Sequence, residues 1–163
     1  MKPVPKAIRR REGDLIKINL GDDRHCYAQV ATEPLIVFFG GVFGEDIGSE
    51  EIARLPVIFR ICVMNDAVKH GRWPVVGWSV LAPENRREPF FFKQDAMTGR
   101  LALYHSSFAA TGWERAASLS ECAGLECAAV WDAQHEEDRL RDYHAGKPNK
   151  WVESLQIDVR AIP

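Results

Sequence analysis

The residue types best suited to chemistry in this chain are its four cysteines and five histidines. Cys122 and Cys127 are separated by four residues, and His135 lies eight positions further on. Structural zinc sites show more closely spaced cysteine pairs and four ligands, so this spacing does not predict a metal site. Gly40, Gly41 and Gly44 lack the spacing and the following lysine of a phosphate-binding loop. We therefore predict no metal and no other cofactor.

A nucleophilic thiol needs a histidine base within hydrogen-bonding reach and a third group that orients the base. The available pairs combine Cys26 or Cys62 with His25, His70 or His105. His25 and Cys26 are neighbours in a predicted strand, so their side chains point to opposite faces. No complete set follows from the sequence, and we read the cysteines as small core residues of a protein that is not an enzyme.

Two acidic groups offer a different kind of function, the binding of a basic partner. Acidic surface segments steer basic proteins into contact, although charge runs more often only solvate a surface. The first group precedes and begins a short helical turn, and the second lies in a predicted helix. The first group comprises Glu45, Asp46, Glu50 and Glu51, and the second comprises Glu136, Glu137 and Asp138. We take the first group as the leading partner-binding candidate.

Trp73 and Trp78 flank one predicted strand. An exposed tryptophan is a frequent anchor of protein interfaces, whereas a buried one is the commoner case. The sequence leaves open which of the two is exposed.

The basic N-terminal arm supports a nucleic-acid-binding alternative. In that reading, a small β-barrel is joined to an arm that grips phosphates through Lys2, Lys6, Arg9, Arg10 and Arg11. The net charge of −2 and the pI near 6.2 oppose it, because phosphate binding needs a positive surface. The same arm also fits a disordered solubilising tail. We divide the chain into the arm, residues 1–12, and one β-rich domain, residues 13–163.

Length and composition predict a soluble globular protein. The 163 residues suffice for one core, and 46% hydrophobic with 27% charged residues is ordinary globular usage. The N-terminus lacks the apolar run of a secretory signal peptide, and no window reaches the length of a membrane-spanning helix. Four cysteines in such a chain are typical of reduced thiols, so we expect a cytoplasmic protein without membrane contact.

Short runs with a period of two predict a mostly antiparallel sheet. The Gly21-Asp22-Asp23-Arg24 turn predicts a hairpin between the first two strands. Ser49 is expected to cap a short helical turn, and residues 65–72 form a polar connection. About seven strands are expected from such runs, at 14–20, 25–31, 35–39, 56–64, 75–81, 89–93 and 101–105.

The C-terminal third predicts one main helix over residues 119–146, capped by Ser118 or Ser120 and interrupted at Gly124. Residues 155–159 alternate and predict a last strand. The expected fold class is α+β, a mostly antiparallel sheet or partly open barrel with that helix near the C-terminus. The expected helix faces are an apolar one with Leu125, Ala128, Ala129, Trp131, Leu140 and Tyr143, and a water-facing one with Glu136, Glu137 and Arg141.

The joint order of four short patterns resembles the immunity protein 26 family of bacterial polymorphic toxin systems, over roughly residues 10–155. The resemblance implies a protein that binds a cognate toxin domain and blocks it, and it supplies no functional residues. The patterns are Gly13-Asp14, Trp73-Pro74-Val75-Val76-Gly77, Phe91-Phe92-Lys93-Gln94-Asp95, and Leu125-Glu126 to Trp131 with Arg139 downstream.

Overall fold

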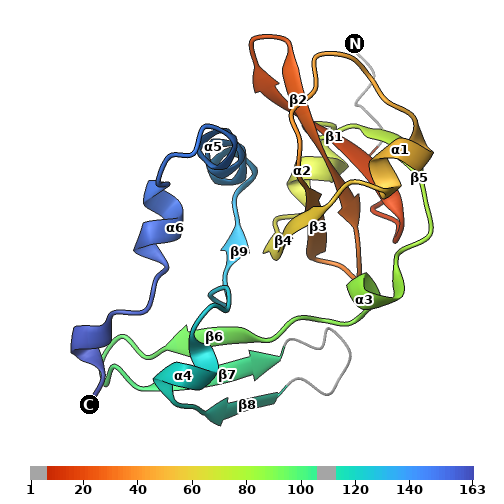
Figure 1. Ribbon diagram of the computed structural model, residues 1–163. Coiled ribbons are helices and arrows are strands. Elements are labelled where there is room, and N and C mark those ends of the chain that lie inside the picture. The colour runs from red at the N-terminus through yellow and green to blue at the C-terminus, as the bar shows by residue number, and fades with distance from the viewer. Residues whose placement is uncertain (1–6, 106–112) are drawn as a thin grey trace, which may run out of the picture.

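The protein has an α+β fold built on two sheets, as the computed structural model in Figure 1 shows for residues 7–105 and 113–163. The larger sheet has the strand order β5-β1-β2-β3-β4-β9 and does not close into a barrel. Its strands are β1 (Asp14–Gly21), β2 (Arg24–Val30), β3 (Leu35–Phe39), β4 (Val57–Val63), β5 (Val75–Trp78) and β9 (Val130–Trp131). The predicted fold class is confirmed.

A smaller antiparallel sheet follows in the order β6-β7-β8. Its strands are β6 (Phe91–Gln94), β7 (Leu101–His105) and β8 (Trp113–Ala116). It lies below the larger sheet in Figure 1, and the chain returns from it through β9, which pairs in parallel with β4. Neither β8 nor β9 is among the predicted strands.

The β1–β2 hairpin forms because its turn residues tolerate left-handed backbone conformations. Asp22 and Asp23 have φ angles of 53° and 55°. Two central residues with positive φ define the tight hairpin turn that matches strand twist, and aspartate is among the residues that adopt it. The predicted turn is confirmed, and it places Asp22 and Asp23 on the surface.

The core surrounds β3, whose five residues are all buried. Ile36 and Phe38 pack in a cluster with Trp73 and Leu140, while Val37 packs on the other face with Ile52. Alternate strand residues point to opposite faces, so a strand covered on both sides reads as a continuous apolar run.

Helices cover both faces of the larger sheet. They are α1 (Ser49–Ala53), α2 (Asp66–Lys69), α3 (Pro83–Arg86), α4 (Leu119–Cys122), α5 (Ala133–His144) and α6 (Lys150–Ser154), followed by a 3₁₀ turn (Val159–Ala161). The predicted cap at Ser118 is confirmed by a reciprocal capping box with Glu121. The predicted cap at Ser49 is wrong, because Gly48 is the N-cap residue of α1 and makes no side-chain bond. Every helix in the described ranges is too short or too polar to cross a membrane.

The predicted helix over residues 119–146 is also wrong in its extent. Gly124, with φ of 80°, follows the end of α4, and the next residues are irregular up to β9. Cys127 bridges to Phe92 of β6, and Trp131 belongs to β9. Asp132 then caps α5, its side chain accepting from the Gln134 N–H. Strand pairing therefore overrides the helical composition of this segment.

The predicted strand over residues 155–159 is wrong as well. Leu155 follows α6, and Asp158 caps the 3₁₀ turn by accepting a hydrogen bond from the Arg160 N–H. Gln94 of β6 fixes the segment, because its side chain donates to the Asp158 carbonyl and accepts from the Asp158 N–H. The Asp158 cap and the two hydrogen bonds with Gln94 take the place of the strand pairing that the alternating pattern predicts.

Candidate partner-binding surface

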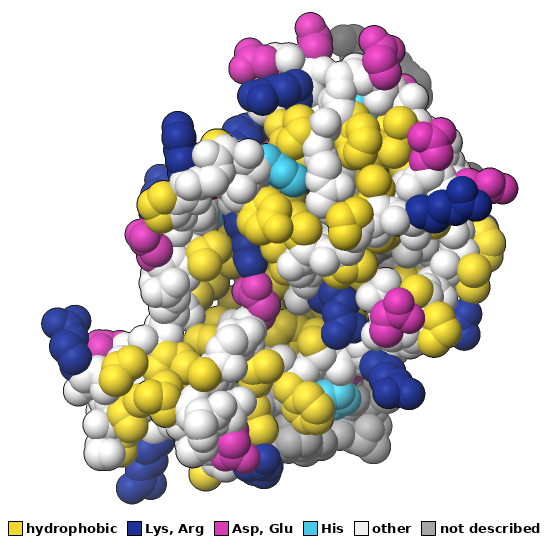
Figure 2. Space-filling model, in the orientation of Figure 1, with side chains coloured by type: hydrophobic (Ala, Val, Ile, Leu, Met, Phe, Trp, Pro, Cys, Tyr) yellow, Lys and Arg dark blue, Asp and Glu magenta, His cyan; other side chains and the backbone are white. Residues whose placement is uncertain are grey.

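Acidic side chains gather at the upper end of the molecule in Figure 2, over the β1–β2 turn and the chain that leads to α1. We call residues 43–53 the acidic loop. Its four predicted acids, Glu45, Asp46, Glu50 and Glu51, are all exposed. The exposed turn residues Asp22 and Asp23 extend the same acidic end, since the Asp23 carbonyl lies near Gly44. Sequence reasoning assigned these two only to a turn.

The acidic loop is held from beneath by β2. His25 exchanges two backbone hydrogen bonds with Phe43, at 2.9 and 2.8 Å. The Tyr27 hydroxyl accepts from the Ile47 N–H at 3.2 Å and lies 2.8 Å from His25 Nε2. Ile52 of α1 is buried in the core cluster that contains Tyr27. The loop is thus a fixed surface, which lowers the entropy cost of binding a partner.

The loop stays acidic at neutral pH because its buried neighbour is uncharged. Lys17 Nζ donates to Asp46 Oδ1 at 2.6 Å, and this hydrogen bond lowers the pKa of Asp46. Burial lowers the pKa of His25, and the nearby Lys17 charge lowers it further. His25 is therefore neutral near pH 7, and the carboxylates of Glu45, Glu50 and Glu51 are not offset by it.

Replacing Tyr27 with phenylalanine tests how the loop is held. The variant removes the acceptor of the Ile47 N–H and the partner of His25, so we expect a loss of about 1 kcal/mol in the free energy of unfolding. Amide exchange over residues 45–53 should accelerate. Urea denaturation and hydrogen exchange measure both, with Tyr104→Phe in the second sheet as the control. Unchanged exchange in the loop would show that Tyr27 does not hold it.

An exposed apolar row lies beside the acidic loop, on the strand at the edge of the larger sheet. Val76 and Trp78 of β5 and Val80 just after it have 45%, 49% and 61% of their surface exposed. We call these three residues the edge row. Trp73 is fully buried, which answers the question that the sequence left open. Gly77 lies close to Ser49 of α1, so α1 adjoins β5 on the face opposite to the Trp78 side chain.

The second predicted acidic group does not form a surface patch. Glu136 is fully buried and Glu137 is 6% exposed, so the prediction that they face water is wrong. Glu137 accepts from Arg72 and from the Trp73 indole. Asp138 accepts from Arg141 and from the Trp151 indole. The Trp73 and Trp151 indoles thus satisfy Glu137 and Asp138, whereas the Glu136 carboxyl oxygens have no partner among the described residues.

A buried arginine joins α5 to the segment before β9. Arg139 donates to both carboxylate oxygens of Glu126, and its guanidinium lies 3.9 Å from the centre of the Phe59 ring. Glu126 also accepts a backbone hydrogen bond from Phe92 of β6. The pair therefore links the two sheets through α5. No pattern in the sequence predicts this contact beyond the presence of both residues.

The fold keeps apart the cysteines and histidines that the sequence offers for a nucleophilic or metal site. Cys26 packs in one core cluster, whereas His25 lies beside Tyr27, which belongs to another, as predicted for strand neighbours that point to opposite faces. Burial raises the pKa of Cys26 to about 12 and that of Cys62 to about 11, so both thiols stay protonated and are weak nucleophiles. His135 stacks on Trp151. Within residues 7–105 and 113–163, no cluster of His, Cys, Asp and Glu could hold a metal ion.

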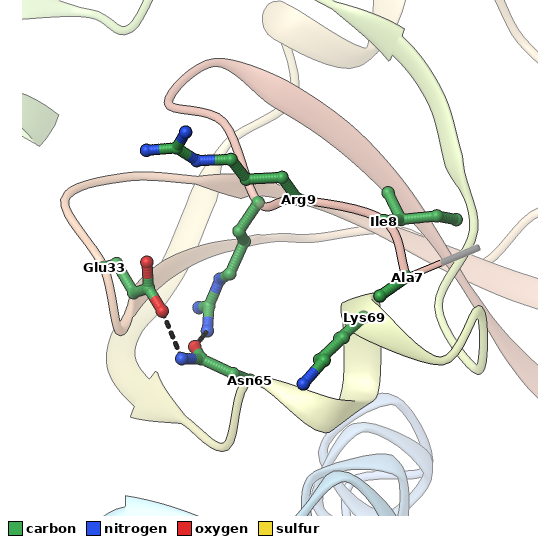
Figure 3. Close-up of a pocket in the computed structure, with 7 residues that line it drawn as sticks. Ala7, Ile8, Arg9, Glu33, Asn65 and Lys69 are labelled. Carbon is green, nitrogen blue, oxygen red and sulfur yellow. Dashed lines mark hydrogen bonds between the residues drawn. The ribbon is translucent and has the colours of Figure 1, made fainter.

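The basic arm directs two of its arginines to the protein itself. Arg10 donates to the Val63 and Pro34 carbonyls and to Asn65, and Arg11 pairs with Asp14. Figure 3 shows that Asn65 also donates to Glu33, while the Arg9 side chain points away from both. Lys2 and Lys6 lie outside the described residues. These contacts engage Arg10 with the protein itself, which weakens the nucleic-acid alternative, whereas the Arg11 side chain stays 68% exposed.

Part of this chain matches a known protein family. The family model described as Immunity protein 26 matches residues 11–102, more than half of the chain. This chain belongs to the Immunity protein 26 family. The matched part includes the acidic loop and β5 and ends before α5. Searches of curated proteins and of solved structures gave no significant match. Family membership supports an immunity function.

Proposed function

We propose that this protein protects its own cell by binding a cognate toxin domain of a polymorphic toxin system and covering the toxin's active site. The action is stoichiometric and not enzymatic, and it takes place in the cytoplasm. The observation that carries the proposal is the exposed acidic loop, which β2 and α1 hold in a fixed shape. Membership in the Immunity protein 26 family supplies the class of partner.

Covering an active site requires a preformed surface of ordinary interface size, about 800 Å² on each partner. The acidic loop approaches the Asp22–Asp23 turn at Gly44 and β5 at Ser49, so exposed acids and exposed apolar residues are available along it. Such a surface suits a basic partner, because opposite charge raises the rate of association while buried aromatic anchors provide most of the affinity. Toxins that cleave nucleic acids fit, since their active sites must attract phosphates.

Charge reversal in the acidic loop tests this proposal. The variant carries Glu45→Lys, Glu50→Lys and Glu51→Lys, and it keeps Asp46 because that side chain binds Lys17. We expect the association rate to fall about 10- to 100-fold at low salt, with a flatter dependence on ionic strength. The rate is measured by stopped-flow fluorescence with an inactivated form of the cognate toxin domain.

The control has the same net charge and the same number of substitutions. Asp66, Glu84 and Glu153 are exposed acids outside the loop and are replaced by lysine together. This control should lose far less of the association rate. Equal slowing in the two variants would mean that overall charge, and not the acidic loop, steers the toxin.

A further inference from the structure

We propose that the open edge of β5 is the place where the toxin docks, with an extended basic segment of the toxin adding to the larger sheet as a further strand. This inference deepens the proposed function and rests on it. Trp78 is its central anchor, and the acids of α1 select lysine or arginine in the added segment. Three features of the described residues support it: the free edge, the fixed tryptophan and the adjoining acids.

The edge of β5 is free to accept a strand. β5 is the first strand of the sheet order and pairs with β1 alone, Gly77 opposite Leu15 and Trp78 opposite Asp14. The Ser79 N–H continues this pairing by donating to the Gly13 carbonyl. Among the described residues, no bond joins the outer side of β5 to another segment. An exposed edge of this kind presents unpaired backbone groups to an incoming strand.

The edge row carries the side-chain pattern that strand addition uses. Val76, at a β-bulge in the pairing with β1, Trp78 and Val80 are exposed in succession along this edge, where an added strand can contact them. The Trp78 indole is already fixed, since Nε1 donates to the Glu12 carbonyl at 3.0 Å. Gly13 permits this position, because a side chain there would collide with the indole. A tryptophan held in place before binding loses little entropy when it becomes an interface anchor.

Charge distinguishes the toxin from a second copy of this chain as the occupant. Glu50 and Glu51 of α1 are exposed, and Ser49 of the same helix packs on Gly77 in the middle of β5. A second copy paired along this edge would bring its own Glu50 and Glu51 to the same interface, and like charges would repel. An added segment with lysine or arginine near α1 is attracted instead. The α1 side of the edge therefore fits a basic polypeptide, while the Arg11 guanidinium lies 5.6 Å from the centre of the Trp78 ring.

Two variants test the inference against the inactivated toxin domain. Trp78→Ala removes the anchor, and Val80→Lys places a charge on the edge that would repel a basic strand. We expect each to weaken binding at least 30-fold, mainly through faster dissociation, as for loss of a central anchor. Val159→Lys, at a residue 60% exposed, is the control and should bind as the original protein does. Thermal unfolding verifies that each variant is folded.

Hydrogen exchange supplies a second readout. Binding of the toxin domain should protect the amides of residues 76–80, and sedimentation should show a monomer before the toxin is added. Toxin binding that is unchanged in both variants, with no protection on β5, would overturn this inference and leave the proposed function intact. A toxin-independent dimer lost in Trp78→Ala would assign the edge to a second copy. No binding by the original protein would overturn both proposals.

Discussion

Replacing Glu136 with methionine is expected to stabilise the protein by about 1–3 kcal/mol at pH 8, because an unpaired buried polar group costs roughly this much. Glu136 is fully buried in α5, and neither carboxylate oxygen has a hydrogen-bond partner. Methionine has a similar length and fills the site without a polar atom. Gains of this kind are common at positions that evolution has not optimised for stability.

The gain should depend on pH in a defined direction. Burial raises the pKa of Glu136 well above its usual value, with Arg139 opposing the shift and Glu126 adding to it. In the unfolded chain the same carboxyl releases its proton near pH 4.3. Above that pH the unfolded state binds fewer protons than the folded state, so the free energy of unfolding falls as pH rises toward the folded pKa. The advantage of methionine is therefore smallest near pH 4, where only the cost of the unpaired protonated carboxyl applies, and it grows toward pH 8.

Urea denaturation of both proteins at pH 4, 6 and 8 measures this dependence. The control is Glu153→Met, at an exposed position, which should change stability by less than about 0.5 kcal/mol at every pH. A Glu136→Met protein that is less stable than the original at pH 8 would show that Glu136 has a partner in solution and is ionised for a structural reason.

The neighbouring glutamate should behave in the opposite way. Replacing Glu137 with alanine is expected to cost about 3 kcal/mol, because a buried donor left without its partner bears the full desolvation penalty. Glu137 accepts from the Trp73 indole at 2.9 Å and from two Arg72 nitrogens at 2.8 Å each. Trp73 is fully buried in the largest core cluster of the described residues, so its N–H has no access to water.

Glutamine at position 137 separates the hydrogen bond from the charge. Glu137→Gln keeps an acceptor for Trp73 and should recover at least half of the loss seen in Glu137→Ala. Urea denaturation measures the free energies of unfolding, and the intrinsic fluorescence of the folded proteins reports on the Trp73 environment. Equal stability of the alanine variant and the original protein would rule out a structural role for this contact.

The sequence predicts the first half of the fold well, because local patterns decide it. Alternating residues in β1, the all-apolar run in β3 and the Asp22–Asp23 turn each specify their own structure. The C-terminal third resists this approach. Its helix-forming composition gives way at residues 124–131 to pairing with β4 and β6, strands that lie far away in sequence. Pairing between distant segments leaves no hydrophobic periodicity in the local sequence from which it could be predicted.

The residues of the candidate surface also divide into those that the local sequence predicts and those that it does not. Exposed acids in a polar loop are visible in the sequence, and Glu45, Asp46, Glu50 and Glu51 lie where they were expected, on the surface. Glu136 and Glu137 have the same composition and are buried, because α5 docks this side against Trp73 and the sheet. The sequence also does not predict the edge row, because the place of a strand in the sheet order decides whether its edge is free.

The most direct test of the central claim is a titration of the active toxin domain with this protein, in which heat of binding and residual toxin activity are followed together. We expect one-to-one binding, with activity abolished when the two proteins are equimolar. Loss of activity at a small fraction of that ratio would contradict stoichiometric occlusion and indicate catalysis. Binding without any loss of activity, or no binding at all, would contradict the proposed immunity mechanism.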